Sequence, residues 1–210
     1  MSNYAYVATR ARSRRSRLLP AEAYNQLLNL EHAEIARYIQ DLEYRREIDR
    51  YGSTLSGADL IETALVDNLA KDVGDFLSFS KGKLRDILHV YAEKYRIENL
   101  KNIVRGINQN MDKQNLERLV CPINDSDKEL YNKLYDSKTV EDMVSSLEGT
   151  SYYNPLKKAL EARNSDSLQP LEDALDLIYY QNLVSNQPSG GADVEVYRDF
   201  VQLKVDIANI

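Results

Sequence analysis

Apolar residues recur at three- and four-residue steps along most of this chain, a spacing that places them on one face of an α-helix. The clearest case is the stretch 84–105, whose first half carries Leu84, Ile87, Leu88, Tyr91 and Tyr95. Its second half carries a set rotated to roughly the opposite side, Ile97, Leu100, Ile103 and Val104. A charged seam at the same spacing consists of Lys94, Glu98, Lys101 and Arg105. A helix whose first half buries one face and whose second half buries the opposite face either lies between two other elements or is broken near its middle. In both cases we expect it to be a core element.

The same spacing divides the rest of the chain into helices separated by turns. The pattern predicts helices over 1–19, 21–30, 32–46, 56–77, 84–105, 111–120, 127–135, 139–147, 154–163, 171–183 and 194–210. Ser56 and Asp59 have the spacing of a capping box, Gly106 is expected to weaken or end its helix, and residues 185–191 form the most flexible linker. Only eight Gly and five Pro interrupt the chain, so the predicted fold class is all-α.

Two parts of the chain resemble each other. A shift of 110 positions aligns residues 61–100 with 171–210 without a gap, with six identical residues and coinciding apolar positions. This register indicates an internal duplication. We therefore predict tandem helical-bundle repeats over 1–108 and 109–210. The first copy continues past Leu100, whereas the second stops at the matching position, Ile210, without a glycine, a cap or a closing turn. The second repeat is therefore expected to be incomplete.

Composition and charge narrow the class of protein. Apolar residues make up 43% of the chain and charged residues 29%, an ordinary balance for a folded domain. No apolar run approaches the ~18 residues that a membrane span needs. The net charge of −6 argues against a chain-wide nucleic-acid surface. Cys121 is the single cysteine, which excludes an internal disulfide and fits a reducing compartment.

The N-terminal stretch is the one strongly basic part of the chain. Residues 1–19 contain no acid and five arginines, Arg10, Arg12, Arg14, Arg15 and Arg17. The apolar residues that share a helical face with one another there are Tyr4, Val7, Ala8, Ala11 and Leu18. The arginines can therefore be the solvated side of an exposed helix. A basic docking surface for a partner and a targeting or RNA-binding segment remain as alternatives.

The residue types that carry catalysis are sparse. His32 and His89 are the only histidines and have no metal-ligand spacing, and Cys121 has no basic neighbour to activate its thiol. Asp173 and Asp176 could hold a cation but are more typical of a solvated helix flank. The tyrosine pairs at 152–153 and 179–180 lack interleaved basic residues and are expected to pack in a half-buried setting. We expect no catalytic residue, no cofactor, no bound metal and no small-molecule substrate.

The sequence gives little support to two other functional classes, a nucleic-acid-binding protein and a metal-dependent enzyme. A nucleic-acid-binding helical protein would use the arginine-rich N-terminal helix, but the acidic net charge disfavours it. A helical-bundle enzyme with a carboxylate metal site would need Glu-x-x-His pairs on facing helices. Asn29 and Asp86 stand three residues before His32 and His89, so neither pair exists.

A series of short segments resembles one known family from end to end. These segments are YAYVATR at 4–10, SRLL at 16–19, LEY at 42–44, DLIETAL at 59–65, YRIENLKNIVR at 95–105, LEGT at 147–150, PLEDALD at 170–176 and FVQLKVDIANI at 200–210. Each is unspecific alone, but their order and coverage are similar to those of the C subunit of archaeal and bacterial A/V-type ATP synthases. The eukaryotic counterpart is the d subunit of the vacuolar proton pump.

The resemblance implies three similar helical units around a pseudo-threefold axis, forming a funnel, of which this chain holds about two. In that family the wide face receives the central shaft and the other face sits on the proteolipid rotor ring. The resemblance therefore implies a non-catalytic rotor subunit, peripheral to the cytoplasmic face of the membrane. Its partners would be central-shaft subunits and the proteolipid ring, with the five arginines as candidate contacts. No nucleic acid is expected as a partner.

Overall fold

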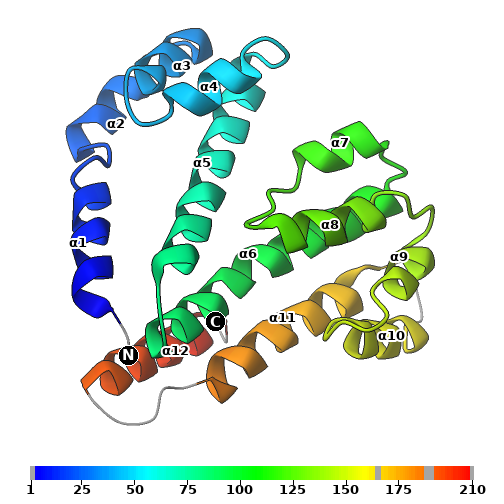
Figure 1. Cartoon of the computed structure of the whole chain (residues 1–210). Helices are drawn as coiled ribbons and strands as arrows, with labels where there is room; N and C mark the ends of the chain where they lie inside the picture. Colours follow the sequence, from blue (N-terminus) through cyan, green and yellow to red (C-terminus); the bar gives the residue numbers. More distant parts are fainter. Residues whose placement is uncertain (1–2, 164–166, 187–191, 209–210) are drawn as a thin grey trace. The chain divides into compact units, whose positions relative to one another are not determined.

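A computed structural model of the chain describes residues 3–163, 167–186 and 192–208, and over these ranges it contains twelve α-helices and no strand (Figure 1). The all-α prediction is confirmed. The helices are α1 Tyr4–Arg15, α2 Ala21–Leu27, α3 His32–Gln40, α4 Arg45–Tyr51, α5 Gly57–Phe79, α6 Lys83–Asn108, α7 Lys113–Arg118, α8 Asp125–Leu134, α9 Val140–Ser146, α10 Tyr153–Glu161, α11 Gln169–Ser185 and α12 Ala192–Ala208. Most of the predicted linker at 185–191, and the last two residues of the chain, lie outside the described ranges.

The helices form two compact units, one over residues 3–80 with α1 to α5 and one from Lys81 onward with α6 to α12. The predicted repeat boundary at 108/109 falls inside the second unit, at the end of α6. Because a repeat is defined by common ancestry and a unit by packing, that boundary stays a prediction. The shift of 110 positions places α5 over α11 and α6 over α12, so helices of the same order occupy both aligned segments.

In the first unit, α3 and α4 pack against α5. The core between them consists of Ala36, Ile39, Ile48, Leu60 and Ala64. The prediction of one helix over 32–46 was wrong, because α3 ends at Gln40 and α4 begins at Arg45. Ile39 and Ile48 are nine residues apart, which in a continuous helix would turn them about 180° away from each other. The intervening turn brings both into one core, and it leaves Leu42 41% exposed.

The start of α5 also differs from its prediction. Ser56 occupies the N-cap position as expected, but its side chain makes no capping hydrogen bond, so the predicted capping box does not form. Gly57 follows in the left-handed region with φ of 62°, which alters the usual entry of the backbone into a helix. A capping box forms at α3 instead, where the Glu31 and Glu34 side chains each accept a backbone hydrogen bond from the other residue.

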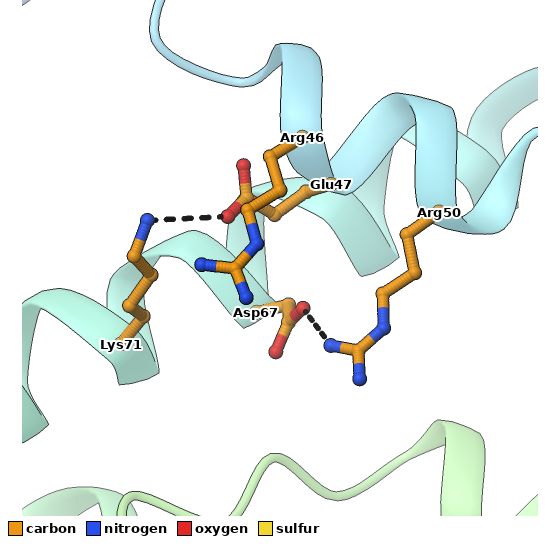
Figure 2. A pocket seen from close by; sticks show the side chains of 5 residues that line it. All are labelled: Arg46, Glu47, Arg50, Asp67 and Lys71. Carbon is orange, nitrogen blue, oxygen red and sulfur yellow. Dashed lines mark hydrogen bonds and ion pairs between the residues drawn. The ribbon is translucent and has the colours of Figure 1, made fainter.

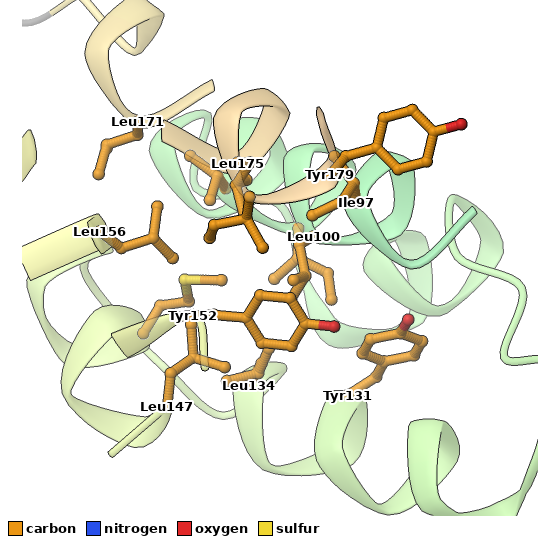
Figure 3. Close-up of a cluster of buried hydrophobic side chains, with 14 of the residues drawn as sticks. Ile97, Leu100, Tyr131, Leu134, Leu147, Tyr152, Leu156, Leu171, Leu175 and Tyr179 are labelled. Carbon is orange, nitrogen blue, oxygen red and sulfur yellow. The ribbon is translucent and has the colours of Figure 1, made fainter. Parts of the chain in front are cut away.

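In the second unit, α6 is the central helix and packs most extensively against α11 (Figure 1). The late flank predicted for the central stretch is fully buried, because Ile97, Leu100, Ile103 and Val104 are all less than 3% exposed. The early flank is only half-buried, with Tyr91 38% exposed. Figure 3 shows side chains of α8 to α11 meeting this helix in one apolar cluster.

Gly106 was expected to weaken or end its helix, and the structure shows that the helix does not end there. α6 continues to Asn108, and Gly106 is buried. A Cβ built at this position would clash with Leu116 Cδ2 and would lie 3.3 Å from Met111 Sδ. The glycine therefore permits α7 to approach the backbone of α6 closely.

Two ion pairs hold α6 to α11. Lys101 Nζ lies 2.6 Å from Asp176 Oδ1. Arg105 donates two hydrogen bonds to the Glu172 carboxylate, of 2.8 and 2.6 Å. The last two members of the predicted charged row on the central helix, Lys101 and Arg105, therefore pair with α11. Asp176, expected on a solvated flank, is one of the partners.

Candidate partner-binding surface

Four of the five candidate arginines lie on α1, and Arg17 lies in the turn that follows it. Arg12, Arg14 and Arg15 occupy the last turn of this helix, where positive charge interacts favourably with the helix dipole. The five residues are neighbours in sequence, but the structure gives them different surroundings.

Arg14 is the arginine most fully engaged within the first unit. Its guanidinium lies 2.6 Å from Asp72 Oδ1 and 2.5 Å from Asp75 Oδ2, and 5.0 Å above the ring of Phe76. Burial raises the pKa of Asp72, although the charge of Arg14 acts to lower it. Only 25% of the Arg14 side chain is exposed. We infer that this side chain holds α1 against α5.

Arg10 and Arg17 also have partners within the first unit. The Arg10 guanidinium donates to the Tyr6 hydroxyl at 2.9 Å and lies 5.0 Å from the centroid of the Phe79 ring. Arg17 forms an ion pair of 2.8 Å with Glu43, and about half of each side chain is exposed. Since exposed pairs contribute little to stability, Arg17 can exchange this partner for another at low cost.

Arg12 and Arg15 are exposed, and their side chains make no hydrogen bond or ion pair with any other described residue. They stand three residues apart on α1, so their side chains are neighbours on the helix surface. The predicted apolar face of this helix is only partly buried: Val7 is 6% exposed, whereas Leu18 is 65% exposed. The prediction that five arginines contact a partner stays a prediction, and Arg12 and Arg15 are its best placed members.

A polar network in the second unit was not anticipated from the sequence. The Arg96 guanidinium donates to Asp127 Oδ1 at 2.8 Å and to Glu93 Oε2 at 3.2 Å, and the Tyr152 hydroxyl donates to Glu93 Oε1 at 2.6 Å. Burial and the Glu93 charge raise the pKa of Tyr152. Spacing of three residues links Glu93 with Arg96, but nothing in the sequence indicates that Asp127 and Tyr152 join them.

This network borders a pocket of about 430 Å³, which His89 also lines. Burial, followed by the charges of Arg96 and Arg85, lowers the pKa of His89, so the imidazole is neutral at physiological pH. Glu93 and Asp127 both accept from Arg96, so each carboxylate already has a cationic partner. The arrangement is that of a structural ion-pair network rather than of a general base next to a nucleophile.

The remaining candidate residues have packing or solvent roles. Cys121 is half-buried, and its backbone exchanges two hydrogen bonds with the Asn99 side chain, of 2.8 and 3.2 Å. His32 is exposed at the start of α3. Tyr179 is buried with its ring 5.2 Å from that of Tyr180. Within the described ranges, no group of three or more His, Cys, Asp or Glu side chains could hold a metal ion.

None of the helices in the part of the chain that the structure describes combines the length and the apolar character needed to cross a bilayer.

Comparison with known proteins gives one consistent match. The family model described as ATP synthase (C/AC39) subunit matches residues 7–210. The chain is 34% identical to the C subunit of the A-type ATP synthase of Archaeoglobus fulgidus and 35% identical to that of Haloferax volcanii, over 99% of its own length in both cases. It is 33% identical to that of Methanosarcina acetivorans over its full length. The chain spans 59%, 60% and 57% of these three relatives, respectively.

Proposed function

This chain belongs to the ATP synthase (C/AC39) subunit family, and from that membership we propose that it is a non-catalytic central-stalk subunit of an A-type ATP synthase. In this role it couples the proteolipid ring of the membrane to the central shaft, at the cytoplasmic face. The observation that carries the proposal is the match over residues 7–210, together with relatives that are each named as the C subunit of an A-type ATP synthase.

The packing of the second unit suits a part that transmits force. A coupling subunit needs helices that do not slide past one another, because torque applied at one end must reach the other. α6 and α11 share a close-packed apolar interface, in which Leu100, Leu171 and Leu175 are fully buried. Two ion pairs, from Lys101 and Arg105, fix the register of the same two helices. Interlocked side chains of this kind resist relative displacement.

Within this proposal, Arg12 and Arg15 contact an acidic surface of a neighbouring subunit. Both guanidinium groups are exposed, and neither has a partner among the described residues. An arginine pair on one helix face can bind carboxylates in bidentate geometry. Arg14 is unsuited to the same task, since moving it would break two ion pairs with α5.

Reversal of these charges tests the contact. We expect Arg12→Glu with Arg15→Glu, introduced in the full chain, to reduce co-purification of the shaft and ring subunits by about tenfold or more. The matched control is Lys128→Glu with Lys133→Glu, which makes the same charge change on two exposed residues of α8. Unchanged recovery in the α1 variant, or equal loss in both variants, would refute the assignment.

A nucleic-acid-binding role predicts a different outcome for the same protein. Three of the five arginines already have partners inside the first unit, which leaves a small basic surface. Binding to RNA or DNA would weaken steeply as salt increases. We expect no such binding, and a fluorescence anisotropy titration with labelled RNA at two salt concentrations checks this.

A further inference from the structure

A small pocket in the first unit has a chemistry that the proposed role does not use. It lies between α4 and α5, has a volume of about 150 Å³ and is lined by charged side chains alone, Arg46, Glu47, Arg50, Asp67 and Lys71 (Figure 2). A volume of this size has room for several water molecules or one small ion, since a water occupies about 30 Å³ in the liquid.

Glu47 is the unusual member of the lining. It is 2% exposed, and its Oε2 is buried without a hydrogen-bond partner. The Lys71 ammonium lies 3.7 Å from Oε1, a distance that is too long for a hydrogen bond. Figure 2 shows these two groups pointing toward each other from α4 and α5. A buried carboxylate that accepts no hydrogen bond is costly, so the site favours an occupant that can donate one.

Some of the other charged groups that line the pocket already have a partner within the chain, and others do not. Asp67 accepts from Arg50 at 3.2 Å and from the Tyr51 hydroxyl at 3.1 Å, which neutralises that carboxylate. Arg46 is exposed, and its side chain makes no hydrogen bond or ion pair with the other described residues. Three cations and two carboxylates thus leave the pocket with one net positive charge. The site therefore favours an occupant that is also an anion.

We propose that this pocket binds inorganic phosphate in a protonated form. Its charged oxygens accept hydrogen bonds from Arg46 and Lys71, and its hydroxyl donates to the Glu47 carboxylate. Few small anions provide a donor and several acceptors together. Sulfate and phosphodiesters are anionic but carry no proton near neutral pH, so they would place their lone pairs against those of Glu47. Glu47 therefore selects free phosphate over sulfate and over lipid or nucleic-acid diesters.

The inference is independent of the coupling role, because it rests only on side chains of α4 and α5. Isothermal titration calorimetry of the full chain with inorganic phosphate, sulfate and dimethyl phosphate tests it directly. We expect phosphate to bind at least about tenfold more tightly than sulfate or dimethyl phosphate, the effect of one charge-assisted hydrogen bond gained or lost. Failure of phosphate to bind, or equal binding of the three anions, would overturn the proposal.

Two substitutions assign the effect to this pocket. Glu47→Gln keeps one acceptor oxygen but replaces the other with an amide NH2 that donates, so we expect it to strengthen sulfate binding and to reduce the preference for phosphate over sulfate. Arg46→Ala should weaken phosphate about tenfold. Arg45→Ala is its control, since Arg45 is the adjacent exposed arginine, lies outside the pocket lining and pairs with Asp41 at 3.6 Å.

Preservation of phosphate binding in Arg46→Ala, or a loss of the same size in Arg45→Ala, would contradict the assignment. Arg46 is exposed, so its removal does not threaten folding, and this variant tests the proposal even if Glu47→Gln is unstable.

Discussion

The ion pair between Lys101 and Asp176 predicts an asymmetry between its two single substitutions. The Lys101 side chain is 9% exposed, whereas that of Asp176 is 43% exposed. Asp176→Asn leaves a buried ammonium without its counter-charge. Lys101→Met leaves a carboxylate that water can solvate, and it places an apolar side chain of similar length in the apolar interface.

The magnitudes follow from that difference in burial. Removal of one partner of a fully buried pair costs ~3–5 kcal/mol. Because Asp176 is nearly half exposed and Asn still offers an acceptor oxygen, we expect Asp176→Asn to lower the free energy of unfolding by about 1–3 kcal/mol. Replacement of a buried ion by an apolar side chain is often neutral, so Lys101→Met should change the free energy by less than about 1 kcal/mol.

Urea denaturation followed by far-ultraviolet circular dichroism measures both changes. The chain has two compact units, so amide hydrogen exchange in α6 and α11 is needed to assign the loss to the second unit. If Lys101→Met destabilises this unit as much as Asp176→Asn or more, the reasoning from unequal burial is wrong.

Three further predictions concern stability. A hydrogen bond from Arg105 lowers the pKa of Glu172. The stability that the ionised Glu172 contributes is therefore present above the ordinary glutamate pKa of ~4.3 and is lost as pH falls through the lowered pKa. Glu172→Gln should flatten the acid limb of a plot of unfolding free energy against pH. Gly106→Ala should destabilise by about 1–3 kcal/mol in urea denaturation, because overpacking against α7 outweighs the gain in helix propensity of ~1 kcal/mol, and a stabilised variant would contradict the close approach. Arg14→Ala should lower the thermal midpoint of the first unit by several degrees, whereas Arg12→Ala should leave it nearly unchanged, and equal shifts in calorimetry would refute the distinction between them.

Helical periodicity predicted the long elements well because burial follows it directly. The late flank of α6 was identified from spacing alone, and Leu100 and Ile103 are fully buried. The break between α3 and α4 was missed for a physical reason. The apolar residues of 32–46 keep a helical spacing, so the sequence gives no local sign of a break. The break is needed only because Ile39 and Ile48 must face the same core, which local spacing does not reveal.

The candidate site was less predictable, since its members depend on residues distant in sequence. The sequence shows five clustered arginines, but Asp72 and Asp75, which engage Arg14, lie about 60 positions away. Nothing in the local pattern separates Arg14 from Arg15. The burial of Glu47 was likewise not predicted, because nothing in the local sequence separates it from its exposed neighbour Arg46.

Membership in a rotary ATP synthase complex underlies the functional proposal. Its most direct test is affinity purification of the tagged, unmutated chain from membranes of cells that make it, followed by quantitative mass spectrometry. We predict that central-shaft and proteolipid subunits are recovered with the chain in fixed proportion. Recovery of the chain without either group, while both are present in the same membranes, would contradict its membership.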